Sequence, residues 1–400
     1  MSYKIKVKPE DFIVKEISSI SLKKNGKFGV FLLKKKGWNT VDLLKKIAQK
    51  LKIPFDNISY GGKKDRHAIT EQFITIKNPP NKIEIKENNF ELKHIGFSDE
   101  PMNPRLINYN LFKITVRAIP KEKIDSIIFQ IEKIKKYGFI NYFDDQRFGS
   151  FDPKQGFIAE KIIKGHYNGA LKIYLTHIHP EDKKEAKERK RKIFEYWGNW
   201  SICLNFAKTK FEKFAFSHLI ENKKDYIKLL QKIPKEEMSM FFSAYQSFLW
   251  NETVRRLIKS LLPDETLITH KGIAGDYIFF DEIDNKNFEY LKILEIPTPS
   301  SKAKMPDKFI EKIYMEILSE RQIKPSQFNL KKIRQAFFKS SMRAVVIIPK
   351  IDYTIENDEV YKNKNKLILE FTLPRGSYAT VVIKRIFAEK RRNHALLRSS

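Results

Sequence analysis

A single carboxylate surrounded by cations is the most reactive arrangement in this sequence. Asp65 follows Lys63 and Lys64 and precedes Arg66, in a run that begins with two glycines and reads GGKKDRHAITEQ over residues 61–72. Positive neighbours favour the ionised carboxylate, and an ionised, well-positioned carboxylate can act as a nucleophile. The same cations can hold a polyanion against it. The alternative interpretation is a solvated, charged turn, because short motifs alone are weakly specific.

A second cluster of reactive side chains reads GFINYFDDQRFG over residues 138–149. Aromatic rings stack on bases, amides read base edges, and arginine pairs with phosphate, so this set suits an extruded nucleobase. Asp144 and Asp145 could suggest a glycosidase pair, but adjacent residues on a strand point to opposite faces, which argues against cooperation. The alternative is a tight turn with packed aromatics.

Other catalytic arrangements are less well supported. His177 and His179 lack a nearby third ligand, so surface positions are favoured over a metal site. The single cysteine, Cys203, excludes an intrachain disulfide, and its apolar neighbours favour a place in a core. The glycines at 61–62 lack the spacing of a phosphate-binding loop. We therefore expect no metal site and no nucleotide cofactor held by a phosphate-binding loop.

Alternating apolar residues and helical spacing predict the elements that position these groups. Lys6 would share one face of a first strand with Lys4 and Lys8. Thr40 would cap a helix, and Gly138 would end another that begins near residue 124. Further strands are expected at residues 12–17, 28–33, 111–118, 344–348, 367–373 and 380–387, and mostly helix at 206–262. Strand-rich ends around a helical middle predict one α+β domain interrupted by an inserted domain.

The composition points to an anionic partner. The chain has 77 Lys and Arg against 48 Asp and Glu, a net charge of +29, and nucleic acid is the commonest partner of such an excess. The sequence contains no run of 18 apolar residues that could span a membrane, and its first residues do not resemble a signal peptide. These features predict a cytoplasmic protein with no membrane partner.

Six segments, in order along the chain, resemble the signature motifs of the TruD family of tRNA pseudouridine synthases. They begin with KVKPEDFIV, include the GKKDRHAITEQ run around Asp65 and the NYF and QRFG pieces of the second cluster, and end with LPRGSYAT. The segments occupy residues 6–14, 62–72, 109–112, 141–149, 243–251 and 373–380. Six ordered matches that span nearly the whole chain are far more specific than any one of them.

The resemblance implies an isomerase that converts uridine to pseudouridine in tRNA, at nucleotide 13 of the D-arm region, without a cofactor. Asp65 would be the nucleophile, attacking either the anomeric carbon of the ribose or the uracil ring; both routes are compatible with the sequence. Lys6 matches the family's active-site lysine, and its role would be to pair with Asp65 and keep it ionised.

Further matches imply a substrate-binding set. Phe12, Asn141 and Tyr378 match positions that contact substrate, and Phe143 would pack on the uracil where other pseudouridine synthases carry tyrosine. Phenylalanine exchanges no proton, so a water molecule or Asp65 itself would remove the proton from carbon 5. The expected set is completed by Lys64, Asn110, Gln146 and Arg147.

The sequence also departs from the family pattern. Asp144 stands where the family usually has glycine, which would alter the turn after Phe143. Tyr109 replaces the usual glycine before Asn110, and residues 98–105 lack the expected basic cluster apart from Arg105. These departures concern contacts to RNA and leave the catalytic carboxylate in place.

We therefore expect a pseudouridine synthase-type catalytic domain with a mixed, mostly antiparallel sheet, interrupted by a largely helical TRUD domain. The catalytic domain would comprise residues 1–160 and 339–388, the inserted domain residues 161–338, and a basic tail residues 389–400. The protein would be a monomer that binds tRNA between the two domains, with Asp65 at the floor of the cleft. The alternative is a non-catalytic RNA-binding or RNA-folding protein that uses the same basic surface.

Overall fold

The computed structural model describes residues 3–80 and 83–390, which form two compact units. The first, here called the sheet unit, comprises Met1–Phe139 and Ile347–Phe387. The second, the helical unit, comprises Ile140–Val346 and, of the segment Ala388–Ser400, the described residues 388–390. We keep the domain boundaries of the sequence analysis as a proposal, and most of the predicted basic tail lies outside the described residues.

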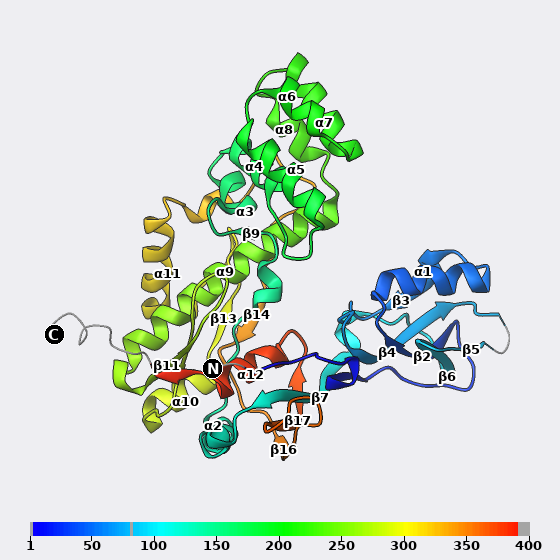
Figure 1. Ribbon diagram of the computed structural model, residues 1–400, viewed down its shortest axis with the longest axis vertical. Helices are drawn as coiled ribbons and strands as arrows, with labels where there is room; N and C mark the ends of the chain where they lie inside the picture. Colours follow the sequence, from blue (N-terminus) through cyan, green and yellow to red (C-terminus); the bar gives the residue numbers. More distant parts are fainter. Residues whose placement is uncertain (1–2, 81–82, 391–400) are drawn as a thin grey trace. The chain divides into compact units, whose positions relative to one another are not determined.

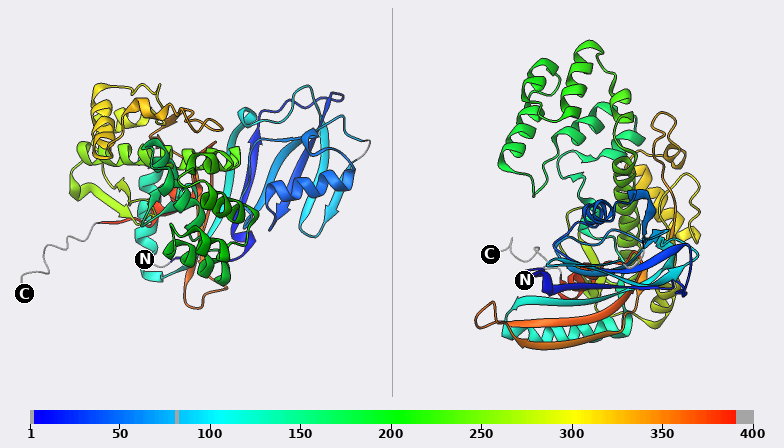
Figure 2. Two further views of the ribbon diagram at one scale, coloured as in Figure 1. Left: turned by 90° about the horizontal axis from the view of Figure 1, so that it is seen from above. Right: turned by 90° about the vertical axis from the view of Figure 1, so that its right-hand side faces the viewer.

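The described strands of the sheet unit form a nine-stranded sheet in the order β16-β17-β7-β1-β4-β2-β6-β5, with β3 also paired to β4 (Figures 1 and 2). β1 and β4 run parallel, and the other neighbouring pairs run antiparallel. The strands are β1 (Phe12–Ser18), β2 (Phe28–Lys36), β3 (Ile58–Tyr60), β4 (Ile69–Lys77), β5 (Glu84–Glu87), β6 (Phe90–Ser98), β7 (Ile107–Ile119), β16 (Ile351–Asn357) and β17 (Asn365–Pro374).

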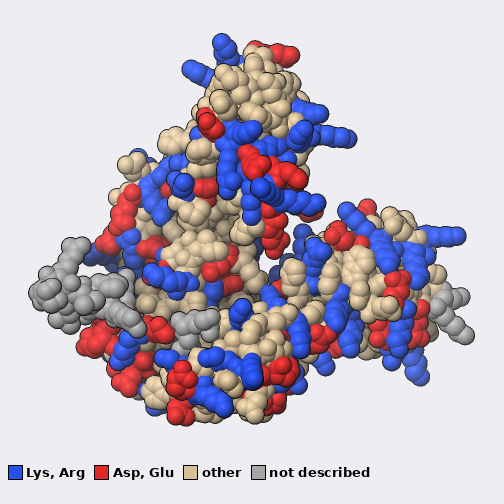
Figure 3. All heavy atoms as spheres, in the orientation of Figure 1, with Lys and Arg blue, Asp and Glu red and all other residues tan. Residues whose placement is uncertain are grey.

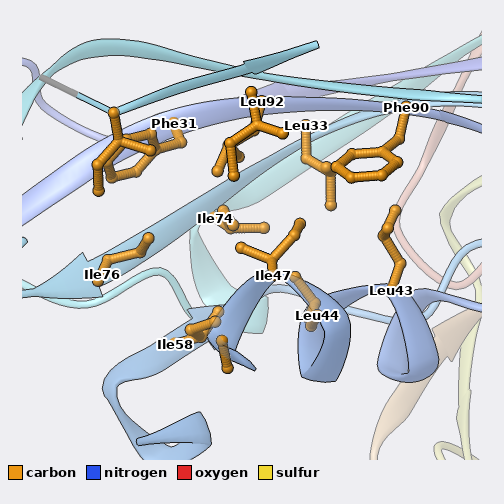
Figure 4. Close-up of a cluster of buried hydrophobic side chains, with 13 residues drawn as sticks. Phe31, Leu33, Leu43, Leu44, Ile47, Ile58, Ile74, Ile76, Phe90 and Leu92 are labelled. Atoms are coloured by element: carbon orange, nitrogen blue, oxygen red, sulfur yellow. The ribbon is translucent and has the colours of Figure 1, made fainter. Parts of the chain in front are cut away.

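Alternation along β2 explains how this sheet buries both faces. Phe31 and Leu33 pack with Ile47 of helix α1 (Thr40–Leu51), which lies across one face of the sheet (Figure 4). Val30 belongs instead to a smaller cluster with Met102. Because successive side chains of a strand point to opposite faces, this single strand contributes to both clusters.

Two helices of the sheet unit pack against each other at the other end of the sheet. Helix α2 (Ile124–Tyr137) ends at Gly138, whose φ of 73° suits glycine, as the sequence predicts. Helix α12 (Ala379–Ile386) lies beside α2, and buried Arg385 donates a hydrogen bond to Gln130. The strand expected at 380–387 is therefore wrong. The residues TVVIKRI favour a strand by propensity, but burial on most sides of the segment accommodates a helix.

The first described residues also differ from expectation. Residues 3–8 form no regular strand; Lys4 alone makes an isolated bridge, with Arg117 of β7. Lys6 has a φ of 57°, in the left-handed region, so the alternation of Lys4, Lys6 and Lys8 on one face is lost. Val7, expected in the core, is 39% exposed. A period-two pattern makes a strand only where a neighbouring strand can pair along it.

The helical unit is built around α9 (Lys235–Leu261), a helix of 27 residues (Figure 1). Most of its residues from Ala244 to Ile258 are buried. Its other helices are α3 (Ile158–Ile163), α4 (Tyr167–Thr176), α5 (Lys184–Glu195), α6 (Trp200–Phe206), α7 (Lys210–Glu221), α8 (Tyr226–Gln231), α10 (Asn285–Ile293) and α11 (Lys308–Glu320). Its short strands are β9 (Phe151–Asp152), β10 (Gly156–Phe157), β11 (Leu267–His270), β12 (Tyr277–Phe280), β13 (Glu295–Pro297), β14 (Met342–Ala344) and β18 (Glu389–Lys390). The pair β8 (Phe139–Ile140) and β15 (Val346–Ile347) lies where the chain passes between units.

These elements confirm the predicted fold class. The sheet unit is α+β with a mixed, mostly antiparallel sheet, and the helical unit is largely helical. Lys and Arg side chains are spread over the visible surface of both units (Figure 3). Among the helices of the described ranges, none is both long enough and apolar enough to cross a membrane.

Candidate active site

The loop that carries Asp65 joins two neighbouring strands of the large sheet. β3 ends at Tyr60 and β4 begins at Ile69, so residues 61–68 form the connection. At Gly61 a Cβ atom would stand only 2.4 Å from the side chain of Ile107. A larger residue at this position would have to displace the Ile107 side chain, so glycine lets the loop pass this close to the start of β7.

Two donors hold the carboxylate of Asp65. The Nζ atom of Lys6 forms an ion pair with Oδ2, and the backbone N–H of His67 donates to Oδ1 at 2.8 Å. Burial raises the pKa of Asp65, but the Lys6 ammonium and the His67 N–H outweigh burial, so the pKa lies below its ordinary value. The Asp65 side chain is 24% exposed. The carboxylate is thus ionised at neutral pH and still accessible.

Lys6 brings a third predicted residue to the same place. Its ammonium lies 4.5 Å from the centroid of the Phe12 ring, a distance typical of a cation–π contact. The Phe12 ring is nearly buried and packs edge-on against Phe112, with centroids 6.3 Å apart. The structure thus brings together Lys6, Phe12 and Asp65.

A buried network fixes the irregular segment that carries Lys6. The backbone of Lys4 exchanges two hydrogen bonds with Arg117, at 2.8 and 3.0 Å. The Arg117 guanidinium donates to both carboxylate oxygens of Asp11 and to Asp358 at 3.0 Å. Since Asp11 immediately precedes Phe12, these contacts anchor the segment on both sides of Lys6 without a strand.

Lys35 is a buried lysine beneath the Asp65 loop that the sequence analysis missed. Its Nζ donates to the backbone carbonyl oxygens of Asp65 and Trp38, each at 2.8 Å. Burial lowers the pKa of Lys35 to about 8, although the nearby Asp65 carboxylate raises it. The sequence does carry a signal, because period-two spacing along β2 places Lys35 on the same face as Phe31 and Leu33.

Thr40 fixes the same loop from the start of α1. The backbone N–H of Lys64 donates to Thr40 Oγ1 at 2.9 Å. The expected capping role of Thr40 is wrong, because the side chain of Asn39 accepts the capping bond from Val41 instead. Thr40 is thereby available to hold the backbone next to Asp65.

Lys64 and Asn110, both expected to bind substrate, contact each other. The Nζ of Lys64 donates to Asn110 Oδ1 at 2.7 Å and lies 2.8 Å from Oε2 of Glu16. Glu16 is buried on β1, and the sequence analysis missed it. Because the Glu16 carboxylate neutralises the Lys64 ammonium, Lys64, which precedes Asp65 in the sequence, is part of a fixed network. Tyr378, also expected to bind substrate, is partly buried at the start of α12.

Asn141 and Phe143 meet in the helical unit around Arg343, which was not predicted. Arg343 donates to the Asn141 side chain oxygen and to its backbone oxygen, both at 2.8 Å. Its guanidinium carbon lies 4.0 Å from the centroid of the Phe143 ring. Asn251, at the end of a recognised motif, exchanges two 2.9 Å hydrogen bonds with the Phe143 backbone. The amide, the ring and the guanidinium form one rigid cluster.

Gln146 and Arg147 lie on the short 3₁₀ turn Asp145–Phe148, and both are exposed. Arg147 approaches the Phe143 ring at 5.8 Å. The neighbouring acids have structural partners: Asp144 is buried and caps this turn, and Asp145 accepts hydrogen bonds from Tyr277 and Ile273 at 2.9 Å. These partners agree with the interpretation that the two acids are not a glycosidase pair.

The two histidines have partners that explain them without a metal. Their rings meet edge to face with centroids 4.5 Å apart, and His177 lies 3.2 Å from Asp152. Within the described part of the chain, no group of three or more His, Cys, Asp or Glu could hold a metal ion. Cys203 is buried, as its apolar context indicates.

Comparison with known proteins gives consistent results. The family model of tRNA pseudouridine synthase D (TruD) matches residues 1–386. A Leptospira interrogans tRNA pseudouridine synthase D is 35% identical over 399 residues, which cover 97% of each protein. A Methanococcus maripaludis protein described as a probable tRNA pseudouridine synthase D 1 is 34% identical over 391 residues, covering 96% of this chain and 99% of that protein.

A solved structure extends the similarity to three dimensions. The crystal structure of the TruD protein from Methanosarcina mazei superposes with a TM-score of 0.73 and 26% sequence identity. The match covers 96% of this chain and 92% of that chain. The pseudouridine synthase-type fold expected from the motifs is thereby confirmed.

Proposed function

Because this chain belongs to the tRNA pseudouridine synthase D family, whose members are isomerases, we propose that it converts a uridine of tRNA to pseudouridine with Asp65 as the nucleophile. The observation that carries the proposal is the ion pair between Asp65 and Lys6. It keeps a partly accessible carboxylate ionised in an otherwise basic loop.

The reaction is an isomerisation, so the substrate keeps all of its heavy atoms. The bond between N1 of uracil and C1′ of the ribose breaks, and a bond between C5 and C1′ forms. The proton on C5 is lost, and N1 gains one. No electron acceptor, nucleotide or metal is needed to balance these changes.

Lys6 would act both before Asp65 attacks, when the carboxylate is ionised, and after the attack. Before attack, its ammonium lowers the pKa of the carboxylate. If Asp65 attacks C1′, negative charge moves from the carboxylate to the departing uracil. Lys6 would then stabilise that charge, because an ammonium can pair with either anion at short range. If Asp65 attacks the uracil ring instead, Lys6 would stabilise the resulting adduct.

Within the helical unit, Asn141 and Phe143 remain the residues that we propose for contact with the uracil. Both side chains are buried here, because Arg343 lies over the Phe143 ring and both ends of the Asn141 amide are hydrogen-bonded, to Arg343 and to the carbonyl oxygen of Ala344. Arg343 would therefore have to exchange these contacts for the uracil before the Phe143 ring could stack on the base and the Asn141 amide could bind a base edge. The proton on C5 would leave to Asp65 or to water, because phenylalanine cannot accept it.

We propose nucleotide 13 in the D-arm region as the target. Purified protein would be incubated with tRNA transcripts that carry uridine or cytidine at position 13, and pseudouridine would be mapped at single-nucleotide resolution. We expect one new pseudouridine, at position 13, in the uridine transcript only. Modification at another uridine would refute the proposed position, and tight tRNA binding without any pseudouridine would favour a non-catalytic RNA-binding protein.

A further inference from the structure

A surface hollow in the helical unit has the chemistry of a nucleotide-binding site. It has a volume of about 660 Å³ and lies between the loop around Ser300 and the segment 328–340. Four cations line it, Lys302, Lys331, Arg334 and Lys339, together with serine hydroxyls and the Asn329 amide. No carboxylate is found among the described residues that line it. Such a lining favours an anionic ligand.

Phe337 is the unusual residue of this hollow, because its side chain is 71% exposed. Its neighbour Phe338 is buried and stacks on Phe242 of α9, with centroids 4.6 Å apart. The chain therefore buries one ring of the pair and presents the other to solvent. A single exposed apolar side chain is common on protein surfaces, but this one lines a hollow together with four cations.

The segment that carries Phe337 is held on both sides. The Gln335 side chain donates to the carbonyl of Leu230 in α8 at 2.8 Å. The Gln246 side chain of α9 donates to the carbonyl of Lys339 at 3.2 Å. The exposed ring thus belongs to the fixed segment 335–339. A ligand that stacks on the ring would not have to order a flexible loop.

The hollow is also close to the cluster around Phe143. Ser340, which lines the hollow, is three residues from Arg343, so their Cα atoms are at most about 11 Å apart. The segment between Ser340 and Arg343 is held by the chain before Ser300. The Thr298 N–H donates to the carbonyl oxygen of Ser341 at 2.9 Å, and β13 pairs with β14 at Arg343. A strand of RNA whose uridine lay on Phe143 could therefore reach the hollow within a few nucleotides.

We propose that this hollow binds an unpaired nucleotide of the RNA substrate, with its base stacked on Phe337 and its phosphates paired with Lys331, Arg334 and Lys339. The inference rests on the proposed function for the identity of the RNA. Aromatic rings bind bases of any sequence, and lysines flanking a ring bind the backbone on either side of the base. The hydroxyls and amide of the hollow can donate to a base edge or to the sugar.

The test compares variants of the full-length chain for binding to an unmodified tRNA transcript at one fixed salt concentration. Phe337→Ala removes the ring, Phe337→Leu keeps apolar volume without a ring, and Phe337→Trp restores a stacking surface. The matched control is Phe309→Ala, which removes a 42% exposed ring on α11 that does not line the hollow.

We expect Phe337→Ala and Phe337→Leu to raise the Kd for tRNA about 5- to 150-fold, the range that follows from the usual strength of base stacking. KM should rise with Kd, and kcat at saturating RNA should be unchanged. Phe337→Trp should keep near wild-type affinity, and Phe309→Ala should stay within about twofold. Lys331→Gln and Lys339→Gln should each reduce the dependence of log Kd on log salt by about one.

Two results would overturn the inference. One is a Phe337→Ala protein whose Kd and KM stay within about twofold of wild type while wild type still makes pseudouridine. The other is a Phe337→Ala protein that changes self-association in sedimentation without weaker RNA binding, because the ring would then be a protein contact. If wild type makes no pseudouridine but Phe337→Ala still weakens RNA binding, the proposed function fails and this inference stands.

Discussion

Replacing Lys6 by methionine should move the acid limb of the activity profile upward in pH. The change removes the ammonium that pairs with Asp65 but keeps an apolar stem of similar length. With Lys6 present, the pKa of Asp65 lies below its ordinary value of 3.8, so activity should be lost only at pH values below 3.8. Without it, burial, which raises the pKa of Asp65, becomes the dominant influence.

The expected size of the shift follows from the geometry of the pair. Two charges about 4 Å apart interact by about 4 kcal/mol at an effective dielectric constant of about 20, and one pKa unit corresponds to about 1.4 kcal/mol. Both side chains retain some exposure, 17% for Lys6 and 24% for Asp65, which weakens the interaction. A rise of roughly 1–3 units in the pKa of Asp65 is therefore expected, and the acid limb should move upward in pH by the same amount.

The assay is release of tritium from carbon 5 of uridine in a tRNA transcript, under single-turnover conditions with saturating protein, between pH 4.5 and 8. The wild-type rate should be nearly flat, whereas the Lys6→Met rate should fall toward the acid end of this range. Lys6→Arg keeps the charge and should retain the wild-type shape. An acid limb that is unchanged in Lys6→Met would refute the claim that Lys6 keeps Asp65 ionised.

Three further outcomes are expected. Arg343→Lys loses the planar donors that bind Asn141 and should lower kcat/KM about 5- to 150-fold, whereas Arg256→Lys, on a surface ion pair with Glu320, should stay within about twofold. Ile47→Ala, in the fully buried cluster of Figure 4, should lower the free energy of unfolding in urea by about 2–5 kcal/mol, whereas Ile293→Ala, 78% exposed, should change it by less than about 0.5 kcal/mol. Because the pKa of Lys35 falls from 10.5 to about 8, the unfolded chain binds more protons between these values, so this group makes stability rise with pH there. Lys35→Met should remove that rise, as urea unfolding at pH 8 and pH 10 would show; an unchanged pH dependence would contradict burial of a charged Lys35.

The elements that the sequence predicted well are those whose pattern is satisfied locally. β2 and α1 carry clean two-residue and helical spacings, and Gly138 ends α2 because only a residue that tolerates positive φ suits that turn. The prediction of a strand at residues 380–387 is wrong because β-branched side chains favour a strand by propensity, whereas burial in the fold stabilises a helix there. The prediction of a strand at residues 3–8 is wrong because an alternating pattern forms a strand only where a neighbouring strand pairs along it, and here Lys4 alone makes a bridge, with Arg117.

The residues of the candidate site likewise differ in whether the sequence could predict them. Asp65 and its motif are contiguous, so a single carboxylate among cations could be recognised directly. Arg343 stands 202 residues from Asn141, and no local pattern connects them. Glu16 and Lys35 lie on faces that their strands bury, so both could have been found by asking which polar residues interrupt an apolar face. Contacts between residues that are far apart in the sequence, such as Arg343 and Asn141, could be recognised only from the folded structure.

The most direct test is the replacement of Asp65 by asparagine, which keeps the shape of the side chain and removes its charge. Pseudouridine formation and tRNA binding would be measured on the same protein, with Asp56→Asn as a control in the neighbouring Phe55–Asn57 turn. We predict that Asp65→Asn forms no pseudouridine and binds tRNA at least as tightly as wild type, while Asp56→Asn keeps full activity. Continued pseudouridine formation by Asp65→Asn would show that another group is the nucleophile.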